Sequence, residues 1–362
     1  MSKKILHITA WYPTYENLAE ALWIQRHIET LEPYFEQEIL HLKIETGPFR
    51  LQKKQTGNLT QLKLILPTNS YRIKEIAAFF VLFYQLLRSS GGFDIVNFHI
   101  AYPNLVYLVA LKRFFKAKWV ITEHWSAYHF HFHSKKKLRR IKNIFRHDLP
   151  LITVSENLLQ DIEQFSDHKI KNHKIIPNAV NTNIFKFTNT PKEDFYLLAS
   201  FWKSPKNPLP VFRACHLLLQ QGICIKLKII GYGPMISEMN SEIKSLILND
   251  NVEFLGYKNA AEIADYMNRA KAFIMPSEYE TFSAITAEAL CCGLPVIASD
   301  SGALSELINK QNGLLVTNSN WQDAIFEFEN KPLYHCDEIA REAAAKFSYE
   351  AVGRTYAQFL NG

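Results

Sequence analysis

The segment from Pro276 to Val296 constrains the fold most strongly, because it joins two apolar strands through a polar loop and a helix. The apolar run 272–275 is typical of a buried strand, and a helix is predicted to begin near Phe282. A glycine and a proline shortly before Val296 mark the end of that helix. A strand, loop, helix and strand in succession indicate a parallel sheet, in which ligands bind beyond the carboxyl ends of the strands.

Two carboxylates in this segment, Glu280 and Glu288, are unusual. Glu280 lies in the loop before the helix, where the amides of Thr281, Phe282 and Ser283 are expected to form an anion site. Glu288 lies within a helix of small and apolar residues, where a charge is costly without a partner or a wet cleft. Two acids beside an anion site suggest a ligand with both phosphate and hydroxyl groups, such as a nucleotide sugar. The alternative interpretation is a helix-terminal charge at 280 and an exposed helical position at 288.

The order of residues around these carboxylates resembles that of a known family. The two glutamates are separated by seven residues, within Pro-Ser-x-x-Glu-x-Phe and Glu-Ala-x-x-x-Gly-x-Pro-Val-Ile-Ala. This pattern is similar to the signature of the retaining glycosyltransferases of family 4. The resemblance implies an α/β fold of the GT-B type, with two Rossmann-like parallel-sheet domains facing an interdomain cleft. It also implies that Glu280 orients sugar hydroxyls and that Glu288 contacts the ribose.

The domain organisation follows from the succession of strands and helices in a chain of 362 residues, which is long enough for two domains. By the resemblance, residues 1–188 form an N-terminal Rossmann-like domain that binds the acceptor. Residues 189–346 form a C-terminal Rossmann-like domain that binds the nucleotide-sugar donor. The last helix, about 347–362, is expected to return to the first domain. The polar stretch 43–57 is predicted to be a loop.

Three residues of the first half are candidates for the site. Asn17 lies in the loop after the first predicted strand and is a candidate on the acceptor side. Family members often have a glycine in this loop, and here Ala21 takes the nearest position. His99 and His124 each follow a predicted strand, at its carboxyl end. The resemblance implies that His124 touches the donor sugar near its reacting carbon and that His99 lines the acceptor pocket. The alternative for a lone histidine is a satisfied, half-buried side chain.

Lys206 is the strongest candidate for a cation that binds a diphosphate. It lies in the run Ser-Phe-Trp-Lys-Ser-Pro-Lys-Asn-Pro, which is similar to the family segment where an arginine and then a lysine grip the diphosphate. The usual arginine position holds Phe201, and Lys203 is a neighbouring candidate for the second charge. The alternative is two solvated lysines in a loop. The resemblance thus assigns catalytic roles to His124, Glu280 and Lys206.

Two further donor-binding candidates follow strands of the second half. Gly231 belongs to a Gly-x-Gly-Pro turn similar to that of the family, and Tyr257 lies where the nucleotide base often binds. The sequence contains no Asp-x-Asp motif, so we expect neither a metal ion nor another cofactor, and lysines and amides would stabilise the leaving diphosphate. Five cysteines without repeated spacing predict no disulfide framework.

The basic segment 135–146 carries much of the formal net charge of +6. Its apolar residues repeat at helical spacing, so one side of the predicted helix is apolar and the rest is basic. Such a helix suits an anionic membrane surface, and the alternative is an ordinary surface helix packed through its apolar side. No nucleic-acid-binding motif accompanies it. The sequence shows no signal peptide. Its apolar runs are all shorter than the stretch of about 20 residues that a helix needs to span a bilayer. We therefore expect a cytoplasmic protein, with peripheral attachment to the inner face of the membrane through 135–146.

The leading hypothesis is a retaining glycosyltransferase that moves a sugar from a nucleoside-diphosphate sugar to a glycan or lipid-linked acceptor. Its expected setting is the synthesis of a cell-surface polysaccharide or a glycolipid. Two alternatives remain: a sugar-nucleotide epimerase or phosphorylase of the same architecture, and a non-catalytic GT-B scaffold protein. The sugar, the base and the acceptor are not specified by the sequence.

Overall fold

The computed structural model describes residues 3–13, 21–88, 92–130, 135–317, 320–330 and 334–362. The chain divides into two compact units. The first unit consists of Met1–Asn178 together with Val352–Gly362, and the second of Ala179–Ala351. This division and the predicted boundary at 188/189 both lie in the strand-free stretch between the last strand of the first unit and the first strand of the second.

The first unit is built on a sheet that contains eight strands in the described residues, in the order β3-β4-β2-β1-β5-β6-β7-β8. Their bounds are β1 Lys4–Thr9, β2 Glu36–Thr46, β3 Arg50–Thr56, β4 Leu59–Leu66, β5 Ile95–His99, β6 Lys118–Glu123, β7 Leu151–Thr153 and β8 His173–Ile175. All neighbours pair in parallel except β3, which runs antiparallel to β4. The central strands are buried nearly throughout, as parallel strands covered on both faces must be.

Strand β3 corrects the prediction of a loop over 43–57. Its residues, Arg-Leu-Gln-Lys-Lys-Gln-Thr, are all exposed and show no apolar alternation. The strand forms because β4 offers an edge and because Gly57, at φ +56°, makes the tight turn between them. An exposed edge strand rich in lysine resists pairing with other chains.

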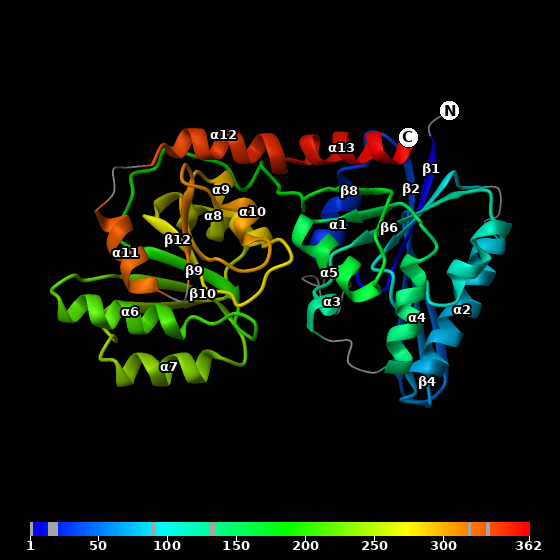
Figure 1. Ribbon diagram of the computed structural model, residues 1–362, viewed down its shortest axis with the longest axis horizontal. Coiled ribbons are helices and arrows are strands. Elements are labelled where there is room, and N and C mark those ends of the chain that lie inside the picture. The colour runs from blue at the N-terminus through cyan, green and yellow to red at the C-terminus, as the bar shows by residue number, and fades with distance from the viewer. Residues whose placement is uncertain (1–2, 14–20, 89–91, 131–134, 318–319, 331–333) are drawn as a thin grey trace. The chain divides into compact units, whose positions relative to one another are not determined.

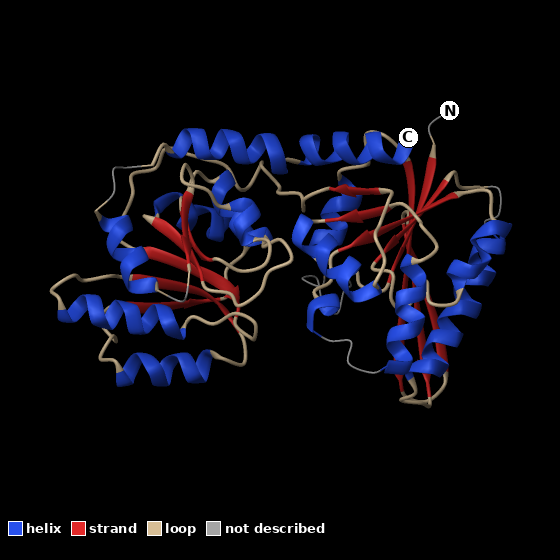
Figure 2. Cartoon of the chain, in the orientation of Figure 1, coloured by secondary structure: helices blue, strands red, loops and turns tan. Residues whose placement is uncertain are grey.

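Helices and a 3-10 helix lie between these strands in the sequence, and one further helix belongs to the end of the chain (Figures 1 and 2). Their bounds are α1 Leu22–Glu29, α2 Tyr71–Arg88, the 3-10 helix η1 Leu108–Phe114, α3 Ala127–Phe130, α4 Lys135–Phe145, α5 Glu156–Ser166 and α13 Tyr349–Asn361. Within the first unit, α13 is held by Lys118, whose ammonium donates to the carbonyls of Phe359 (3.2 Å) and Leu360 (3.1 Å). A cation at a helix C-terminus stabilises it.

The second unit is built on a parallel sheet that contains six strands in the described residues, in the order β11-β10-β9-β12-β13-β14. Their bounds are β9 Tyr196–Phe201, β10 Leu227–Tyr232, β11 Val252–Gly256, β12 Ala272–Met275, β13 Val296–Ser299 and β14 Gly313–Val316. The strand order reverses between β9 and β12, which are neighbours. The loops after these two strands therefore leave the sheet in opposite directions, and such a switch point is where doubly wound sheets bind ligands.

Helices cover both faces of this sheet (Figure 1). Their bounds are α6 Leu209–Gln220, α7 Ile236–Ser245, α8 Ala260–Arg269, α9 Ala284–Cys291, α10 Leu304–Leu307, α11 Trp321–Glu329 and α12 Cys336–Phe347. Helices α6, α7 and α11 lie on one face, and α8, α9 and α12 on the other. Trp202, Phe212 and Ile274 are among the fully buried side chains of the core between the sheet and α6. No helix in the described residues is long and apolar enough to cross a membrane.

Candidate functional site

Two loops meet at the switch point of the second unit. The loop after β9 carries Lys206, and the loop after β12 begins at Pro276. Lys206 and Ser277 form an antiparallel bridge. It is closed by the amide of Asn207, which donates to the carbonyl of Pro276 (2.9 Å), and by the amide of Glu278, which donates to that of Pro205 (2.9 Å). The chain therefore joins the two segments that carry the predicted cation and the predicted carboxylate.

The ammonium of Lys206 donates to the carboxylate of Glu280. The side chains are 19% and 10% exposed, respectively, so the ion pair is mostly enclosed. Burial lowers the pKa of Lys206 to about 7, because a charged ammonium loses hydration there. An approaching phosphate would favour the charged form. The alternative of a solvated lysine at 206 is excluded by this enclosure.

The backbone of Glu280 is held by the turn after β13. The amide of Ala303 donates to the carbonyl of Glu280 (2.8 Å). Gly302, at φ +56°, lies so close that a Cβ atom on it would be 2.3 Å from that carbonyl oxygen. A residue larger than glycine at 302 would push Glu280 away from Lys206.

Helix α9 begins at Ala284, later than the predicted start near Phe282. Ser283 precedes it in the left-handed conformation (φ 71°), and its hydroxyl hydrogen-bonds to that of Thr286 (2.8 Å). The left-handed conformation favours glycine, so the backbone of Ser283 is strained. Phe282 is buried against Phe347, with ring centroids 5.7 Å apart. Thr281 is partly exposed beside the helix start.

Glu288 lies within α9 and is 6% exposed, so the alternative of an exposed helical position is wrong. Its carboxylate is near the buried thiols of Cys291 and Cys292. Burial first, and then this carboxylate among nearby groups, raises the pKa of Cys291 to about 12. The thiols are therefore neutral packing groups.

The Gly-x-Gly-Pro turn is required by close packing against the loop after β9. A Cβ atom on Gly231 would lie 1.8 Å from the carbonyl oxygen of Ser200, and one on Gly233 would lie 2.3 Å from that of Trp202. Both glycines have positive φ angles, of 119° and 149°. The turn thus holds the base of the loop that carries Lys206.

An aromatic row, formed by Phe201, Tyr232 and Tyr257, lies along the ends of three adjacent strands. Phe201 ends β9, Tyr232 ends β10 and Tyr257 follows β11. Ring centroids are 5.1 Å apart between Phe201 and Tyr232, and 6.2 Å between Tyr232 and Tyr257. The three side chains are 45%, 54% and 71% exposed. Lys203 is exposed, with its ammonium 5.4 Å from the Phe201 ring centroid.

Tyr232 was not among the residues that the sequence singled out. An aromatic residue at the end of successive strands is a signal, but the strand order that makes β9, β10 and β11 neighbours is decided by the fold. Exposed aromatic faces of this kind can stack on a flat ring, and a cation beside them adds a favourable cation–π contact.

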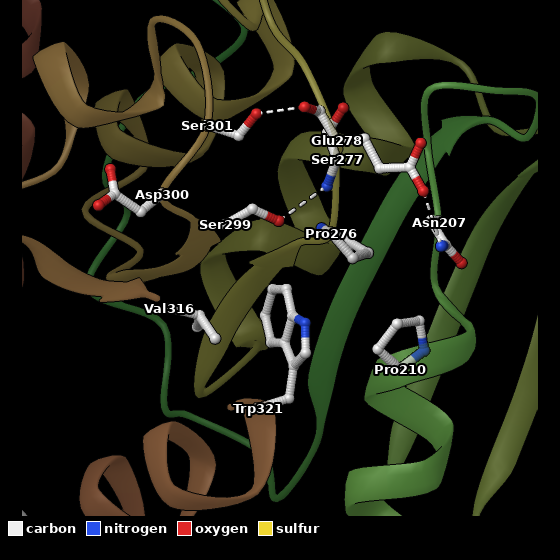
Figure 3. A pocket seen from close by; sticks show the side chains of 10 residues that line it. All are labelled: Asn207, Pro210, Pro276, Ser277, Glu278, Ser299, Asp300, Ser301, Val316 and Trp321. Atoms are coloured by element: carbon white, nitrogen blue, oxygen red, sulfur yellow. Dashed lines mark hydrogen bonds between the residues drawn. The ribbon is translucent and has the colours of Figure 1, made fainter. Parts of the chain in front are cut away.

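A cavity of about 340 Å³ lies beside the ion pair, at the ends of β12, β13 and β14. Figure 3 shows its lining: Asn207, Pro210, Pro276, Ser277, Glu278, Ser299, Asp300, Ser301, Val316 and Trp321. Hydrogen bonds fix its walls, because Asn207 donates to the Glu278 carboxylate (3.0 Å) and the Ser277 amide donates to the Ser299 hydroxyl (3.1 Å). Lys206 and Glu280 are not among these lining residues. The cavity and the ion pair thus share the same two loops.

In the first unit, His124 follows β6 and is 7% exposed. Its Nδ1 lies 3.1 Å from the Asn178 side-chain oxygen, so Nδ1 carries the proton and Nε2 keeps a lone pair. That Nε2 is buried, and no hydrogen-bond partner for it occurs in the described residues. Burial, and then the charge of His27, lowers the pKa of His124 well below its usual range. His124 is therefore a neutral hydrogen-bond acceptor.

His99 is fully buried in a network of polar side chains rather than exposed on a surface. Gln37 accepts a hydrogen bond from Nε2 of His7 (2.8 Å), and Nε2 of His99 lies 3.0 Å from Nδ1 of His7 and 3.2 Å from the Asn97 amide nitrogen. The ring of His99 stacks on that of His124 at 6.0 Å. In this structure, His99 supports the position of His124.

The same network binds helix α13. Asn97 donates to the hydroxyl of Tyr356 (2.7 Å), and Thr122 donates to the side-chain oxygen of Asn97 (2.9 Å). The Tyr356 hydroxyl lies 2.6 Å from Thr122 and donates to it, since the Thr122 proton is already used. The returning helix is thus locked to β5 and β6 of the first unit by a closed set of hydrogen bonds.

Glu123 lies next to His124 and is fully buried. Its carboxyl group accepts from the Ala101 amide (2.7 Å) and from the Tyr128 hydroxyl (2.6 Å). Burial raises the pKa of Glu123 to about 7, although both hydrogen bonds favour the charged form. The sequence did not single out this residue, because its burial arises from chain segments far apart in sequence.

Two other predictions have different outcomes. Asn17 lies outside the described residues. Helix α4 is packed through its apolar side, because Ile141, Ile144 and Phe145 are buried. That side is therefore not available for insertion into a membrane, and the alternative of an ordinary surface helix, packed through its apolar side, holds for it.

No group of three or more His, Cys, Asp or Glu residues in the described part of the chain is placed to hold a metal ion.

Two family models match the chain in succession. Residues 25–184 match the model described as Glycosyltransferase Family 4, and residues 180–341 match the one described as Glycosyl transferases group 1. An uncharacterized glycosyltransferase of Methanocaldococcus jannaschii is 27% identical over 365 residues, which cover 96% of this chain and 95% of the relative. The amylovoran biosynthesis glycosyltransferase of Erwinia amylovora is 29% identical, over 47% of this chain and 46% of that protein.

Solved structures share the fold along nearly the whole chain. Sucrose-phosphate synthase of Thermosynechococcus elongatus has a TM-score of 0.74 at 20% identity, and the match covers 99% of this chain and 98% of that one. The Anabaena protein HepE in complex with UDP has a TM-score of 0.75 at 17% identity, with 99% of each chain covered. The predicted GT-B fold is confirmed. Together with this fold, the two family models make the chain similar to the GT-B glycosyltransferases of family 4.

Proposed function

We propose that this protein is a retaining glycosyltransferase that moves a sugar from a nucleoside-diphosphate sugar to a glycan or lipid-linked acceptor. The observation that carries the proposal is the enclosed Lys206–Glu280 pair at the switch point of the second unit. The names of relatives point to the setting: one is an amylovoran biosynthesis glycosyltransferase, and another is an alpha-monoglucosyldiacylglycerol synthase. Synthesis of a cell-surface polysaccharide or a glycolipid is therefore the expected process.

The second unit is proposed to bind the donor. When the bond between the sugar and the diphosphate breaks, negative charge develops on the diphosphate, and we assign its stabilisation to Lys206 and the amides from Thr281 to Ser283. Binding of the diphosphate would raise the pKa of Lys206 and keep it charged. Glu280, released from part of its contact with Lys206, would accept hydrogen bonds from sugar hydroxyls. Glu288 is assigned to the ribose.

The aromatic row is proposed to stack on the nucleotide base, with Lys203 supplying the second cation in place of the usual arginine. Tyr257 and Tyr232 offer the most exposed rings of this row. Gly231 permits the close approach of the two loops beneath it. HepE, which shares the fold, has been crystallised with UDP and with UDP-glucose, and this supports a uridine nucleotide as the first donor to test.

The first unit is proposed to supply His124, whose unshared Nε2 lone pair suits a sugar hydroxyl near the reacting carbon. The acceptor oxygen would attack that carbon on the face that the diphosphate leaves, and the departing phosphate would take the acceptor proton. No side chain is required as a nucleophile in this scheme, and the configuration at the carbon is retained. No metal ion is needed, because the protein itself supplies the positive charge.

Thermal melting with nucleoside diphosphates in the presence of a chelator tests the donor site. At about 100 times the dissociation constant, a ligand stabilises the folded state by about 2.7 kcal/mol, and the melting temperature rises accordingly. We expect this shift for the wild type and for Lys244→Met, an exposed lysine of α7, and its loss in Lys206→Met. No shift with UDP, GDP or ADP would contradict the donor site. Turnover of a donor without any acceptor would instead indicate an epimerase.

A further inference from the structure

Helix α2 of the first unit has two distinct faces. Glu75, Ala78, Leu82 and Leu86 are buried against the unit. The opposite face carries large apolar residues at helical spacing that remain exposed to solvent: Ile73 (50%), Ile76 (38%), Phe80 (63%), Tyr84 (56%) and Leu87 (48%). We call these five residues the α2 stripe. A surface helix normally turns a polar face outwards, so a continuous exposed apolar stripe indicates an interaction site.

Basic elements lie beside this helix. Arg140 of α4 pairs with Glu75 at 2.9 Å, which places α4 next to α2 and neutralises the buried carboxylate (Figure 1). At the end of η1, Phe115 contacts Phe83 of α2, with ring centroids 6.3 Å apart. The neighbouring Phe114 is 66% exposed. Helix α2 therefore lies between two elements that carry clusters of lysine and arginine.

The charge of this region differs in sign from that of the rest of the chain. Residues 71–146 contain 14 Lys and Arg and 3 Asp and Glu, whereas the other residues contain 27 and 32. Of the three acids, Glu75 and Glu123 are buried. This part of the chain thus has a strongly positive net charge, while the remainder is net negative.

We propose that the α2 stripe docks on an anionic lipid bilayer, with α2 lying in the plane of the interface. Its aliphatic and phenylalanine side chains would enter the acyl boundary, and Tyr84 suits the headgroup level because its ring is apolar and its hydroxyl is polar. Arg139 and Lys142 of α4, with Lys112 and Arg113 of η1, would contact anionic headgroups. A second copy of the chain fits less well, because two like-charged surfaces would face each other.

This inference rests on the proposed function in one respect, because it places the enzyme where a lipid-linked acceptor is found. It also assigns the apolar contact with the membrane to a different helix from the one predicted from the sequence, which was the segment 135–146. Helix α4 contributes charge, whereas α2 contributes the apolar contact. Membrane binding is measured without any transfer reaction, so its failure and the failure of the donor site are distinguishable.

Vesicle flotation tests the proposal, using phosphatidylcholine vesicles with and without phosphatidylglycerol. We expect the wild type to float with the anionic vesicles and Phe80→Glu/Tyr84→Glu to lose at least about tenfold in binding, because two charges would enter the apolar boundary. Both side chains are exposed, so the variant is expected to fold, and circular dichroism together with the UDP-induced melting shift checks this. Leu217→Glu, a 44% exposed leucine on α6 of the second unit, is the matched control and should bind like the wild type.

A second variant separates the electrostatic part. Arg139→Glu/Arg146→Glu reverses the exposed charges of Arg139 in α4 and of Arg146 directly after it, and should weaken binding to anionic vesicles more at low salt than at high salt. Equal flotation of the wild type and Phe80→Glu/Tyr84→Glu would overturn the proposal, as would equal binding to neutral and anionic vesicles. A dimer seen by analytical ultracentrifugation that the same double variant abolishes, without vesicle binding, would show that a second copy covers the stripe.

Discussion

Both units enclose a polar centre at the carboxyl ends of their strands, but they stabilise it in opposite ways. The second unit pairs opposite charges, Lys206 with Glu280, across two loops. The first unit joins neutral groups, among them His7, His99 and Tyr356, through hydrogen bonds between strands and a helix. The polar centre of the first unit is part of its core, whereas the polar centre of the second unit lies at the junction of two loops.

The difference follows from what each centre is expected to do. A charged pair in partial burial gains from its partner but pays for lost hydration, so it is ready to exchange that partner for a charged ligand. A neutral network has no such charge to satisfy, and its closed hydrogen bonds make a rigid frame. Rearrangement is therefore expected at Lys206, and rigidity around His124.

The largest expected effect comes from breaking the charged pair. Lys206→Met leaves the Glu280 carboxylate without its cation, and we expect a loss of about 3 kcal/mol in the free energy of unfolding, measured by urea denaturation. Adding Glu280→Leu should recover most of that loss, because no unpaired charge is then left. If the single variant is as stable as the wild type, the pair does not contribute to folding, and the contrast between the two units fails.

The second effect is a loss of stability in acid that arises in the neutral network. Burial lowers the pKa values of His7 and His27 to about 4, and those of His99 and His124 well below the usual range. The unfolded chain then binds protons near pH 6.5 while the folded chain does not. Stability is fully present above that pH and is lost as the pH falls towards about 4. At about pH 5, each of His7 and His27 would cost about 2 kcal/mol.

The carboxyl group of Glu123 changes the stability with pH in the opposite direction to the histidines. A variant at this position therefore serves as the control. Its folded pKa of about 7 exceeds its unfolded value of 4.5, so its contribution is most favourable below pH 4.5 and is lost as the pH rises through 7. Several histidines outweigh one carboxyl group, so urea denaturation at about pH 5 and pH 7.5 should show a net loss in acid. Glu123→Gln should make that loss steeper. A stability that is constant or greater in acid would mean that the histidines are accessible to solvent.

The smallest effect concerns the hydrogen bonds that bind α13. Tyr356→Phe removes the hydroxyl that Asn97 and Thr122 share and leaves both groups buried, so we expect a loss of about 1–2 kcal/mol in the free energy of unfolding. Tyr257→Phe, at a 71% exposed position, should change stability by less than about 0.5 kcal/mol. Similar losses in the two variants would show that the hydroxyl of Tyr356 is not part of a closed network.

Much of the second unit could be predicted from sequence because its signals are local. The strands read as short apolar runs, the glycines mark tight turns, and Lys206 and Glu280 lie in loops directly after strands. Tyr257 was predicted as a contact of the base, but Tyr232 and the grouping of the aromatic row were missed, since its three residues come from separate strands. Strand β3 was also missed, because an exposed edge strand needs no apolar alternation and forms by pairing with β4.

The first unit shows the limit of the same reasoning. The periodicity of α2 and of α4 was equally visible in the sequence, yet α4 buries its apolar side and α2 leaves one apolar side exposed. A hydrophobic pattern predicts that a helix has an apolar face, but it does not predict which part of the protein covers that face. The membrane hypothesis was therefore attached to the more basic helix, whereas the exposed apolar residues are on its neighbour.

The sequence by itself determined the parallel α/β architecture, the strand ends that carry His124, Lys206 and Glu280, and the glycines that allow close turns. These properties depend on hydrophobic period and backbone conformation, which are local. Tertiary structure decided that Lys206 and Glu280 form an enclosed pair, that His99 is buried beside His124, and that α2 presents an exposed stripe. Burial and pairing depend on residues far apart in the chain, and desolvation, which lowers the pKa of Lys206 and of the buried histidines, exists only once those residues are packed together.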